Sequence, residues 1–238
     1  MAKRKRFTSK LIEAVKITET VKHFKFSIPE DFEYTPGQFM SVIIPHEDQV
    51  LGRAYSISTL PSVKNAVEFT IKLVDGGHGS NHLFNMKEND ELKMIGPSGS
   101  FTMKDEHLNS DLVFIATGTG IAPFRSMIQH LLQNNFPNKI YLFAGVRYIS
   151  EVLYPVEFTQ LQQQHSNFNY FSIVSRPEND NYTGPKGHVQ QLIESHLPSS
   201  FNGQVFICGL SPMINAVQNL LISKGIHANQ IHFEKFDE

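Results

Sequence analysis

The chain has 238 residues, which is enough for one large domain or for two smaller ones that each bury a core. Its 21 Lys and Arg residues nearly balance its 23 Asp and Glu residues, so no overall field draws it to nucleic acid or to an anionic membrane. No apolar run approaches the roughly 20 residues of a membrane-spanning helix, and no signal-peptide core follows the basic residues 3–6. We therefore expect a cytoplasmic protein with no membrane span and no nucleic-acid partner.

The segment from residue 7 to about residue 103 is predicted to be β-structure. Val21, Phe24 and Phe26 have the spacing of inward-facing residues on alternating strands. The turn at Pro36 and Gly37 introduces an apolar strand, and further strands are expected at residues 53–59, 67–74 and 91–101. The helix expected in this half covers residues 80–86. Short strands separated by turn residues are typical of a barrel or a sandwich.

From Asp111 onward the pattern changes to an alternation of strands and helices. Strands are predicted at residues 112–116, 140–145, 168–175, 204–209 and 230–236, and helices at residues 123–134, 151–164, 187–196 and 211–224. This alternation predicts a parallel sheet covered on both faces, with ligands at the carboxyl ends of its strands. The polar run at residues 104–111 separates the halves, which gives domains at residues 1–104 and 105–238.

The turn after the first of these parallel strands has the features of a phosphate site. Thr117, Gly118, Thr119 and Gly120 connect the strand to a helix that has Pro123 in its first turn. Phe124, Ile128, Leu131 and Leu132 form one apolar face of that helix. A helix N-terminus after a glycine turn presents unpaired N–H groups and a partial positive charge to phosphate. The turn lacks the Lys of an NTPase P-loop and the spacing of GxGxxG, so by itself it also fits a plain tight loop.

The eleven histidines suggest a metal centre at first sight, but the single cysteine and the histidine spacing argue against one. A single cysteine, Cys208, excludes an internal disulfide, a four-thiolate iron–sulfur cluster and a zinc site of that kind within this chain. His78 and His82 are four residues apart, but glycines around His78 favour a turn in which the two rings need not share a face. We expect no metal.

Five motifs in order resemble those of the ferredoxin–NADP(+) reductase family of flavoproteins. They are RAYSIS at 53–58, GGHGS at 76–80, GPSG with Phe101 at 96–101, TGTGIAPFRS at 117–126 and CGL at 208–210, and the chain then closes on FEKF at 233–236. The match covers nearly the whole chain. It implies an N-terminal antiparallel Greek-key β-barrel that binds flavin, followed by a five-stranded parallel, doubly wound α/β domain that binds the nicotinamide nucleotide.

The resemblance also implies a flavin site in the first domain. Arg53 is placed on the FAD pyrophosphate, Tyr55 against the isoalloxazine and Ser56 near flavin N5, with Ser58 as a weaker candidate on the same face. The other implied FAD contacts are Ala54, Thr70, Ile71, Lys72, Gly77, His78, Gly79 and Ser80, and the backbone N–H groups near Ser80 are expected to face the second phosphate. Taken alone, Arg53 is also a common kind of surface ion-pair residue.

In the second domain the resemblance assigns residues 117–120 to the dinucleotide pyrophosphate, with Thr117 also reaching the flavin edge. Cys208, with Gly209, is placed beside nicotinamide C4 as a positioning group, although a buried cysteine is elsewhere an apolar filler. Ser175 and Arg176, assisted by Lys186, are candidates to bind a 2′-phosphate, which favours NADPH, although NADH-using relatives carry a similar Ser-Arg-Pro. Phe236 is the candidate aromatic lid and Glu234 the candidate polar group near N5, or the two simply end an edge strand.

The expected activity is hydride transfer from NAD(P)H to FAD, followed by electron transfer to a separate acceptor, with ferredoxin or flavodoxin as the first choice. Oxygenase reductase components usually carry a ferredoxin domain with clustered cysteines, and this chain has no such cluster. The alternatives are an NAD(P)H:flavin reductase, an oxygenase-system reductase, a non-catalytic electron-transfer subunit and a flavin-free nucleotide-binding module. The oligomeric state stays open, with a monomer as the expectation.

Overall fold

The computed structural model describes residues 3–46, 49–178 and 181–236. The chain divides into two compact units. The first contains Met1–Thr102 together with Ala122–Leu131, and the second contains Met103–Ile121 together with Leu132–Glu238. The helix that follows the glycine turn therefore packs for most of its length with the N-terminal part of the chain.

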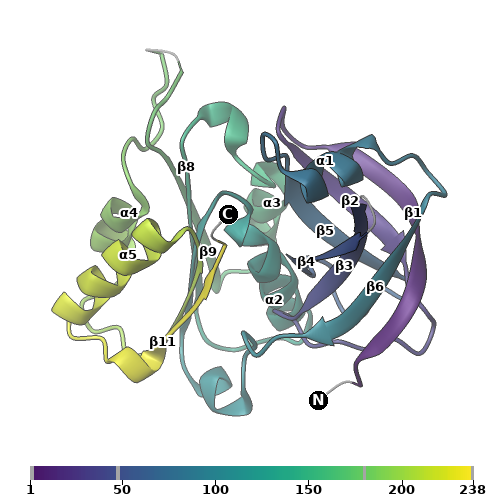
Figure 1. The fold of residues 1–238 in the computed structure, drawn as a ribbon. Helices are drawn as coiled ribbons and strands as arrows, with labels where there is room; N and C mark the ends of the chain where they lie inside the picture. Colours follow the sequence, from purple (N-terminus) through teal and green to yellow (C-terminus); the bar gives the residue numbers. More distant parts are fainter. Residues whose placement is uncertain (1–2, 47–48, 179–180, 237–238) are drawn as a thin grey trace. The chain divides into compact units, whose positions relative to one another are not determined.

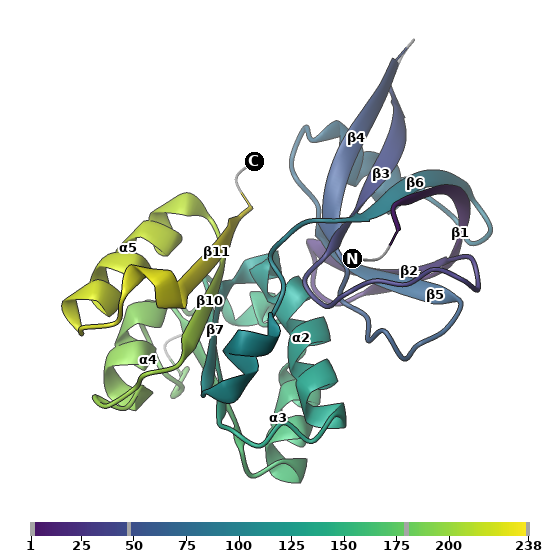
Figure 2. The ribbon, with the colours of Figure 1, turned by 90° about the horizontal axis from the view of Figure 1, so that it is seen from below.

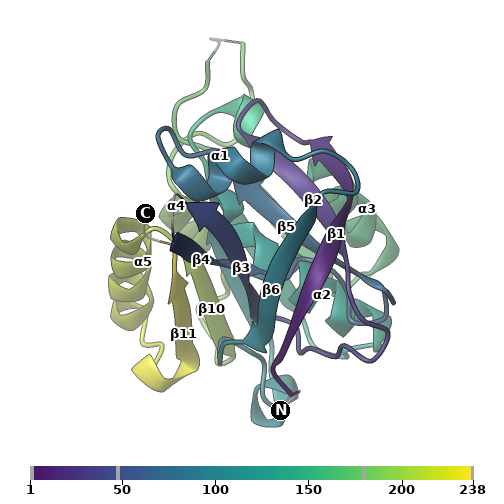
Figure 3. The ribbon, with the colours of Figure 1, turned by 45° about the vertical axis from the view of Figure 1, so that its right-hand side comes forward.

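The first unit is built on a six-stranded antiparallel sheet that curls on itself (Figures 1 and 2). Its strands are β1 (Lys5–Lys16), β2 (Val21–Ser27), β3 (Phe39–His46), β4 (Gln49–Ser56), β5 (Ala66–Lys72) and β6 (Glu91–Ser98). They are ordered β4-β3-β6-β1-β2-β5, so the last strand in sequence is inserted between β3 and β1, as Figure 3 shows. The edge strands β4 and β5 contact each other, which is how the curl brings the two ends of the sheet together. The predicted antiparallel β-domain is confirmed.

The core of this unit lies inside the curl. Phe24, Phe26 and Phe69 are fully buried there, and Val21 is also buried. The alternation in β2 and β5 therefore places the aromatic residues on the concave face, as the sequence predicted.

The helix α1 (His78–Asn85) begins two residues before the predicted start. His78 and His82 consequently lie on one helix, with ring centroids 6.5 Å apart, and the expected turn around them is wrong. The reason is that Gly77 serves as an extended N-cap and Gly79 fits inside the first turn, so the helix begins at the glycines and is not interrupted by them. Among the described residues, no group of three or more His, Cys, Asp or Glu side chains could hold a metal ion.

The second unit contains a five-stranded parallel sheet in the order β11-β10-β7-β8-β9. The strands are β7 (Leu112–Thr117), β8 (Ile140–Val146), β9 (Phe168–Val174), β10 (Gln204–Gly209) and β11 (Ile231–Lys235). The helices α4 (Val189–His196) and α5 (Ser211–Ser223) lie together on one face (Figure 1). The helix α3 (Pro155–Gln164) packs Phe158 against the rings of Phe168 and Tyr170 on β9. The predicted parallel α/β domain is confirmed, with every strand within two residues of its expected position.

Two helices of this unit begin later than predicted, for local backbone reasons. Tyr154 has a left-handed φ of 54° before Pro155, so α3 begins at the proline and the residues before it form a short 3-10 turn. Gly187 has a φ of 136° and His188 is an extended N-cap, so α4 begins at Val189. The remaining 3-10 turns are η1 (Asp105–Asn109), η2 (Gly118–Gly120), η3 (Ile149–Glu151) and η4 (Ala228–Gln230).

The helix α2 (Ile121–Gln133) has the predicted apolar face. Phe124, Ile128, Leu131 and Leu132 are all buried, and Pro123 lies in the first turn. The Phe124 ring packs at 6.0 Å from the ring of Phe101, which follows β6. No helix in the described part of the chain is both long and apolar enough to cross a membrane.

Candidate functional site

The glycine turn of the second unit is packed tightly against the end of β10. Gly118 has a φ of 53° in η2, the left-handed region that favours glycine. A Cβ added to Gly120 would collide with the carbonyl group of Cys208. The TGTG and CGL motifs, which are almost 90 residues apart in the sequence, therefore meet at the carboxyl edge of the sheet because glycine leaves room for two backbones.

Thr117 carries an unsatisfied polar group at this edge. Its Oγ1 atom is buried and has no hydrogen-bond partner in the protein. Gly209 lies beside it with a φ of 151°, and a side chain there would collide with the same hydroxyl. A buried hydroxyl without a partner is uncommon in folded proteins, and a ligand bound at the turn is one group that can supply the hydrogen bond. The turn therefore fits the nucleotide that the sequence motif implies.

Cys208 and Glu234 are adjacent at the same edge, in register on β10 and β11. The Cys208 side chain is completely buried. Burial raises the pKa of its thiol well above the ordinary value, and the neighbouring Glu234 carboxylate raises it further. The thiol is therefore neutral at physiological pH and unsuited to act as a nucleophile. The backbone N–H of Phe236 donates to the Gly209 carbonyl oxygen over 2.9 Å, which ties the tail residue to the same place.

The end of β9 is held against the end of β8. The backbone N–H of Ser175 donates to the Val146 carbonyl over 2.9 Å, and that of Arg176 donates to the Arg147 carbonyl over 2.7 Å. Arg147 and Arg176 are both exposed, so two guanidinium groups follow neighbouring strands. Lys186, also exposed, is bridged to Val174 at the end of β9. The sequence interpretation missed Arg147, although its position directly after β8 at the ligand-binding edge was a usable signal.

In the first unit, α1 begins against the strand that carries the RAYS motif. A Cβ added to Gly79 would lie 3.0 Å from Arg53 Cγ and 3.4 Å from the Tyr55 hydroxyl. Burial raises the pKa of Tyr55 to about 12, so its hydroxyl stays protonated and can donate a hydrogen bond. No side chain caps the N-terminus of α1, and its first turn contains no acidic residue. An uncapped helix N-terminus beside an arginine suits a phosphate group.

The other predicted flavin residues lie on β4, on β5 and in the first turn of α1. Ser56 and Thr70 are buried, Ala54 and Lys72 are exposed, and the Ile71 side chain is part of the core inside the curl. His78 packs its ring 4.1 Å from that of His46, and its Nε2 lies 2.7 Å from the Pro45 carbonyl. The Ser80 hydroxyl accepts the Val74 N–H over 2.9 Å, so the side chain holds the preceding loop. The roles of these residues toward FAD remain predictions.

The Ser58 hydroxyl is engaged within the protein, and its role toward FAD stays a prediction. β4 ends at Ser56, so the alternation of faces does not extend to Ser58. The Ser58 hydroxyl donates to the Glu68 carbonyl oxygen over 3.0 Å. The residue therefore belongs to a network that includes Glu68 and Arg125, both of which sequence reasoning missed.

Comparisons with known proteins match two domain families to the chain. An oxidoreductase FAD-binding domain matches residues 8–103, and an oxidoreductase NAD-binding domain matches residues 114–219. The chain therefore has the FAD-binding and NAD-binding domains of oxidoreductases.

Similar proteins specify the family. The chain is 30% identical over 225 residues to the reductase component DmpP of phenol 2-monooxygenase from Pseudomonas sp. (strain CF600), covering 93% of this chain and 63% of that protein. It is 27% identical over 244 residues to ferredoxin–NADP reductase B of Sorangium cellulosum (strain So ce56), covering 97% of this chain and 98% of that one. The chain belongs to the ferredoxin–NADP(+) reductase family.

Solved structures show the same fold. The Amycolatopsis cytochrome P450 reductase GcoB superposes with a TM-score of 0.91 at 22% identity, covering 99% of this chain and 71% of that one. A ferredoxin NADP+ reductase from Neisseria gonorrhoeae, solved with bound FAD and NADP, superposes with a TM-score of 0.83 at 22% identity, covering 97% and 98%.

Proposed function

We propose that this protein is a reductase that takes electrons from NAD(P)H, passes them through FAD and delivers them to a separate redox protein. The observation that carries the proposal is the carboxyl edge of the parallel sheet, where the glycine turn packs on Cys208 and Gly209 lies beside the unpartnered Thr117 hydroxyl. Glu234 is in register with Cys208 on the next strand. The domains proposed for the two steps are residues 1–104 for FAD and 105–238 for the nicotinamide nucleotide. FAD, when bound, accepts a hydride from the nicotinamide and can release electrons singly.

The first-domain residues are proposed to bind and orient FAD. Arg53 offers a fixed planar fork to the diphosphate, and the uncapped first turn of α1, with Gly79 pressed against β4, offers N–H groups. Tyr55 is proposed to pack on the ring system with its protonated hydroxyl donating to the ribityl chain or a phosphate. Ser56, at the end of β4, is proposed to hydrogen-bond at flavin N5.

The second-domain residues are proposed to position the nicotinamide nucleotide. Residues 117–120 present N–H groups to the pyrophosphate, and the Thr117 hydroxyl gains the partner that it lacks in the protein. Cys208 limits the space beside the nicotinamide ring and keeps its proton, because burial raises the pKa of the thiol. Phe236 is proposed to cover this edge as an aromatic lid, and Glu234 is the proposed polar group near flavin N5. Orientation of this kind is the protein's main contribution to the rate of hydride transfer.

NADPH is the proposed donor. Arg176 and the newly recognised Arg147 are exposed at the ends of adjacent strands, and Lys186 is bridged to the same edge. Two arginines can bind a 2′-phosphate through several charge-assisted hydrogen bonds. NADH lacks that phosphate, so this cluster contributes to the binding of NADPH alone.

The acceptor is proposed to be a ferredoxin or a flavodoxin, with an oxygenase component as the alternative. The chain spans 63% of phenol 2-monooxygenase reductase DmpP and 65% of the phenol hydroxylase P5 protein of Acinetobacter pittii (strain PHEA-2), which is 28% identical. The single cysteine among these 238 residues cannot form a four-thiolate cluster, so the acceptor is proposed to lie outside these two domains. The proposal places a monomeric enzyme in the cytoplasm, where NADPH and such acceptors are available.

Acceptor specificity tests this proposal. The purified protein is passed through gel filtration. NADPH oxidation is then measured with three electron acceptors, which are ferricyanide, free FAD and a ferredoxin whose reduction is followed by its absorbance. We expect FAD to co-elute and ferricyanide and ferredoxin to be reduced. Elution without FAD, with turnover only on added flavin, would instead show a flavin reductase. Bound FAD without NADPH or NADH oxidation by any acceptor would show a non-catalytic subunit.

A further inference from the structure

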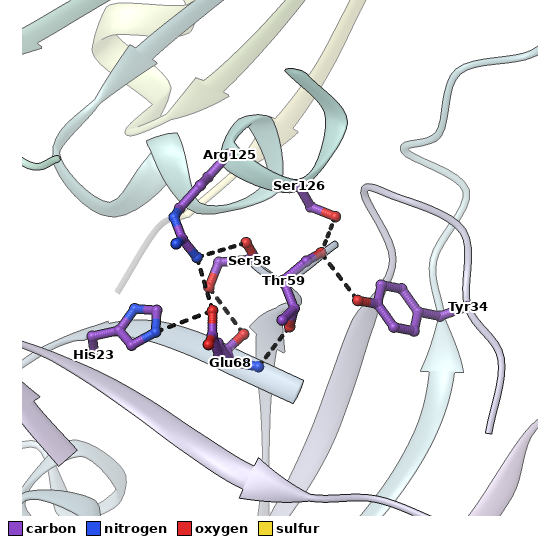
Figure 4. A network of polar contacts seen from close by, with 7 residues as sticks. All are labelled: His23, Tyr34, Ser58, Thr59, Glu68, Arg125 and Ser126. Carbon is purple, nitrogen blue, oxygen red and sulfur yellow. Dashed lines mark hydrogen bonds and ion pairs between the residues drawn. The ribbon is translucent and has the colours of Figure 1, made fainter. Parts of the chain in front are cut away.

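A polar network joins α2 to the strands of the first unit (Figure 4). Arg125 Nη1 donates to Glu68 Oε2 over 2.9 Å and to the Ser58 carbonyl over 3.1 Å. The next residue, Ser126, donates its hydroxyl to the Thr59 carbonyl. We call Ser58, Thr59, Glu68, Arg125 and Ser126 the α2 clamp.

Glu68 is the centre of the clamp and is largely removed from water. Only 16% of its side chain is exposed, and the side chains of Arg125 and His23 are similarly buried, with 15% and 14% exposed. His23 Nε2 lies 3.2 Å from Glu68 Oε2. Burial alone raises the pKa of the Glu68 carboxyl, but hydrogen bonds from His23 and Arg125 and their charges outweigh it and lower the pKa to about 2. The carboxylate is therefore charged at physiological pH, and each partner is needed to compensate its burial.

The clamp is also tied into the backbone around it. The Ser58 N–H donates to the Glu68 carbonyl over 2.9 Å, and the Glu68 N–H donates to Thr59 Oγ1 over 2.7 Å. The Tyr34 hydroxyl donates to the Thr59 carbonyl over 3.0 Å, so this oxygen accepts from both Tyr34 and Ser126. The Thr59 and Glu68 groups that accept hydrogen bonds from α2 are therefore themselves held by hydrogen bonds within the first unit.

The position of the clamp in the sequence gives it a functional meaning. Ser58 follows Ser56 by two residues, and Glu68 precedes Thr70 by two, so both lie next to proposed flavin contacts. Arg125 follows Gly120 by five residues, within the helix that leaves the nucleotide turn directly. The clamp thus lies next to proposed FAD contacts and includes two residues of the helix that follows the nucleotide turn.

Stability alone is a weak explanation for these buried charges. Apolar contacts already pack α2, including Phe124 on Phe101. A buried ion pair commonly adds little net stability compared with apolar residues of similar size, whereas its directional hydrogen bonds define one geometry.

We propose that Glu68 and Arg125 are positioning residues for hydride transfer. Their hydrogen bonds hold the segments that carry Ser56 and Thr70, so that bound FAD keeps the orientation that hydride transfer requires. The inference rests on the proposed function and extends it to residues that contact neither ligand in that scheme.

The test compares the clamp with an exposed ion pair of the same sheet. The clamp variants are Glu68→Gln, Arg125→Met and the double variant. The control variants are Lys10→Met and Glu91→Gln. In the wild type the Lys10 and Glu91 side chains are 60% and 56% exposed, and Lys10 Nζ lies 3.7 Å from Glu91 Oε1. Anaerobic stopped-flow absorbance gives the rate of flavin reduction at saturating NADPH. Equilibrium titration gives the dissociation constant of NADP+, and thermal unfolding of the flavin-free protein gives the stability of each variant.

We expect each clamp variant to retain FAD and to slow flavin reduction by about 10-fold or more, as a small misplacement of reactants does. The NADP+ dissociation constant should change by less than about threefold, because no proposed ligand contact is removed, and the double variant should be no slower than the single ones, because coupled residues are non-additive. Arg125→Lys should recover part of the rate. The Lys10 and Glu91 variants should match the wild type.

Several results would overturn the inference while leaving the proposed function intact. The first is flavin reduction at the wild-type rate in Glu68→Gln and Arg125→Met. The second is loss of FAD with full recovery of the rate on adding FAD back, which would mean that the clamp only retains the flavin. Ser126→Ala removes a single hydrogen bond and provides the same test if the charge variants do not fold. Failure of the proposed function would give a different result, because neither NADPH nor NADH would then reduce the flavin of the wild-type protein.

Discussion

Cys208 and Glu234 occupy the same register position on neighbouring parallel strands, so the one thiol of the chain lies beside a carboxylate. This arrangement keeps the thiol protonated, since burial and the adjacent negative charge both raise its pKa. A neutral, fully buried sulfur has a fixed position and little reactivity, which suits a group that shapes a binding site.

Replacing Cys208 with alanine should slow flavin reduction by NADPH while FAD stays bound. The substitution leaves a small void at the proposed nicotinamide position, and we expect a rate decrease of about 10-fold from the poorer alignment. Stopped-flow reduction, with FAD content measured by absorbance, checks both parts. An unchanged reduction rate would refute the role assigned to Cys208.

Removing the guanidinium of Arg53 should yield mostly flavin-free protein. A bidentate contact to a diphosphate contributes about 1.5–3 kcal/mol, enough to lower FAD affinity by more than 10-fold. The ratio of flavin to protein absorbance after gel filtration is the measurement. Arg6→Ala, which removes an exposed arginine of the same sheet, should keep its FAD. Equal FAD content in both variants would show that Arg53 does not hold the diphosphate.

Gly120→Ala tests the contact between the two motifs of the second domain. The new Cβ would collide with the Cys208 carbonyl, so the turn must shift, at a cost of about 1–3 kcal/mol. We expect a lower unfolding temperature and weaker NADP+ binding. Gly52→Ala is the control, because its added Cβ would have no neighbour closer than 3.8 Å. Normal NADP+ binding by Gly120→Ala would contradict this packing.

His232 should make the protein less stable in mild acid. Its ring stacks at 4.8 Å on Phe206 and packs at 4.5 Å against His107. Burial and the neighbouring His107 lower the pKa of His232 from 6.5 to about 4. The folded state therefore takes up this proton later than the unfolded state, and the stability present above pH 6.5 is lost as the pH falls toward 4.

Because the ring is partly exposed, we expect the free energy of unfolding to fall by only about 1 kcal/mol between about pH 7 and pH 5 on this account. Glu68, whose pKa is lowered from 4.5 to about 2, loses its contribution only at more acidic pH. Urea unfolding of the wild type and of His232→Phe across this range is the measurement. The variant should show a shallower dependence on pH, and identical slopes would contradict the prediction.

Arg176→Ala should reduce the preference for NADPH. If Arg176 binds the 2′-phosphate, the KM for NADPH should rise by about 10-fold or more, as loss of a charge-assisted contact does, and the KM for NADH should stay nearly constant. Arg147→Ala should act in the same direction, because Arg147 is held next to Arg176 by the strand-end hydrogen bond. An equal change in the KM for NADPH and in the KM for NADH would show that Arg176 does not bind the 2′-phosphate.

The strands and the order of the two folds could be predicted because their signals are local. Alternation in β2 and continuous apolar runs in β7 and β10 directly reflect which faces are buried. The start of α1 was missed because glycine usually marks a turn, whereas Gly79 is inside the helix to allow close approach to Arg53. Local composition does not report such a tertiary requirement.

The α2 clamp could not be predicted for a related reason. The apolar face of α2 was evident from its spacing, but periodicity does not say which surface that face covers. Glu68 and Arg125 are 57 residues apart in the sequence, and each alone resembles an exposed charge on a strand or a helix. Ser58 was placed on the flavin face by extending the alternation of β4 past the point where the strand ends.

The central claim is that FAD bound to this protein is reduced by a nicotinamide nucleotide, and an anaerobic titration tests it most directly. The purified protein is expected to show a visible flavin spectrum, and stoichiometric NADPH should bleach it, with NADH acting more slowly. A colourless protein that still binds NADP+, or a bound flavin whose spectrum neither nucleotide changes, would contradict the account.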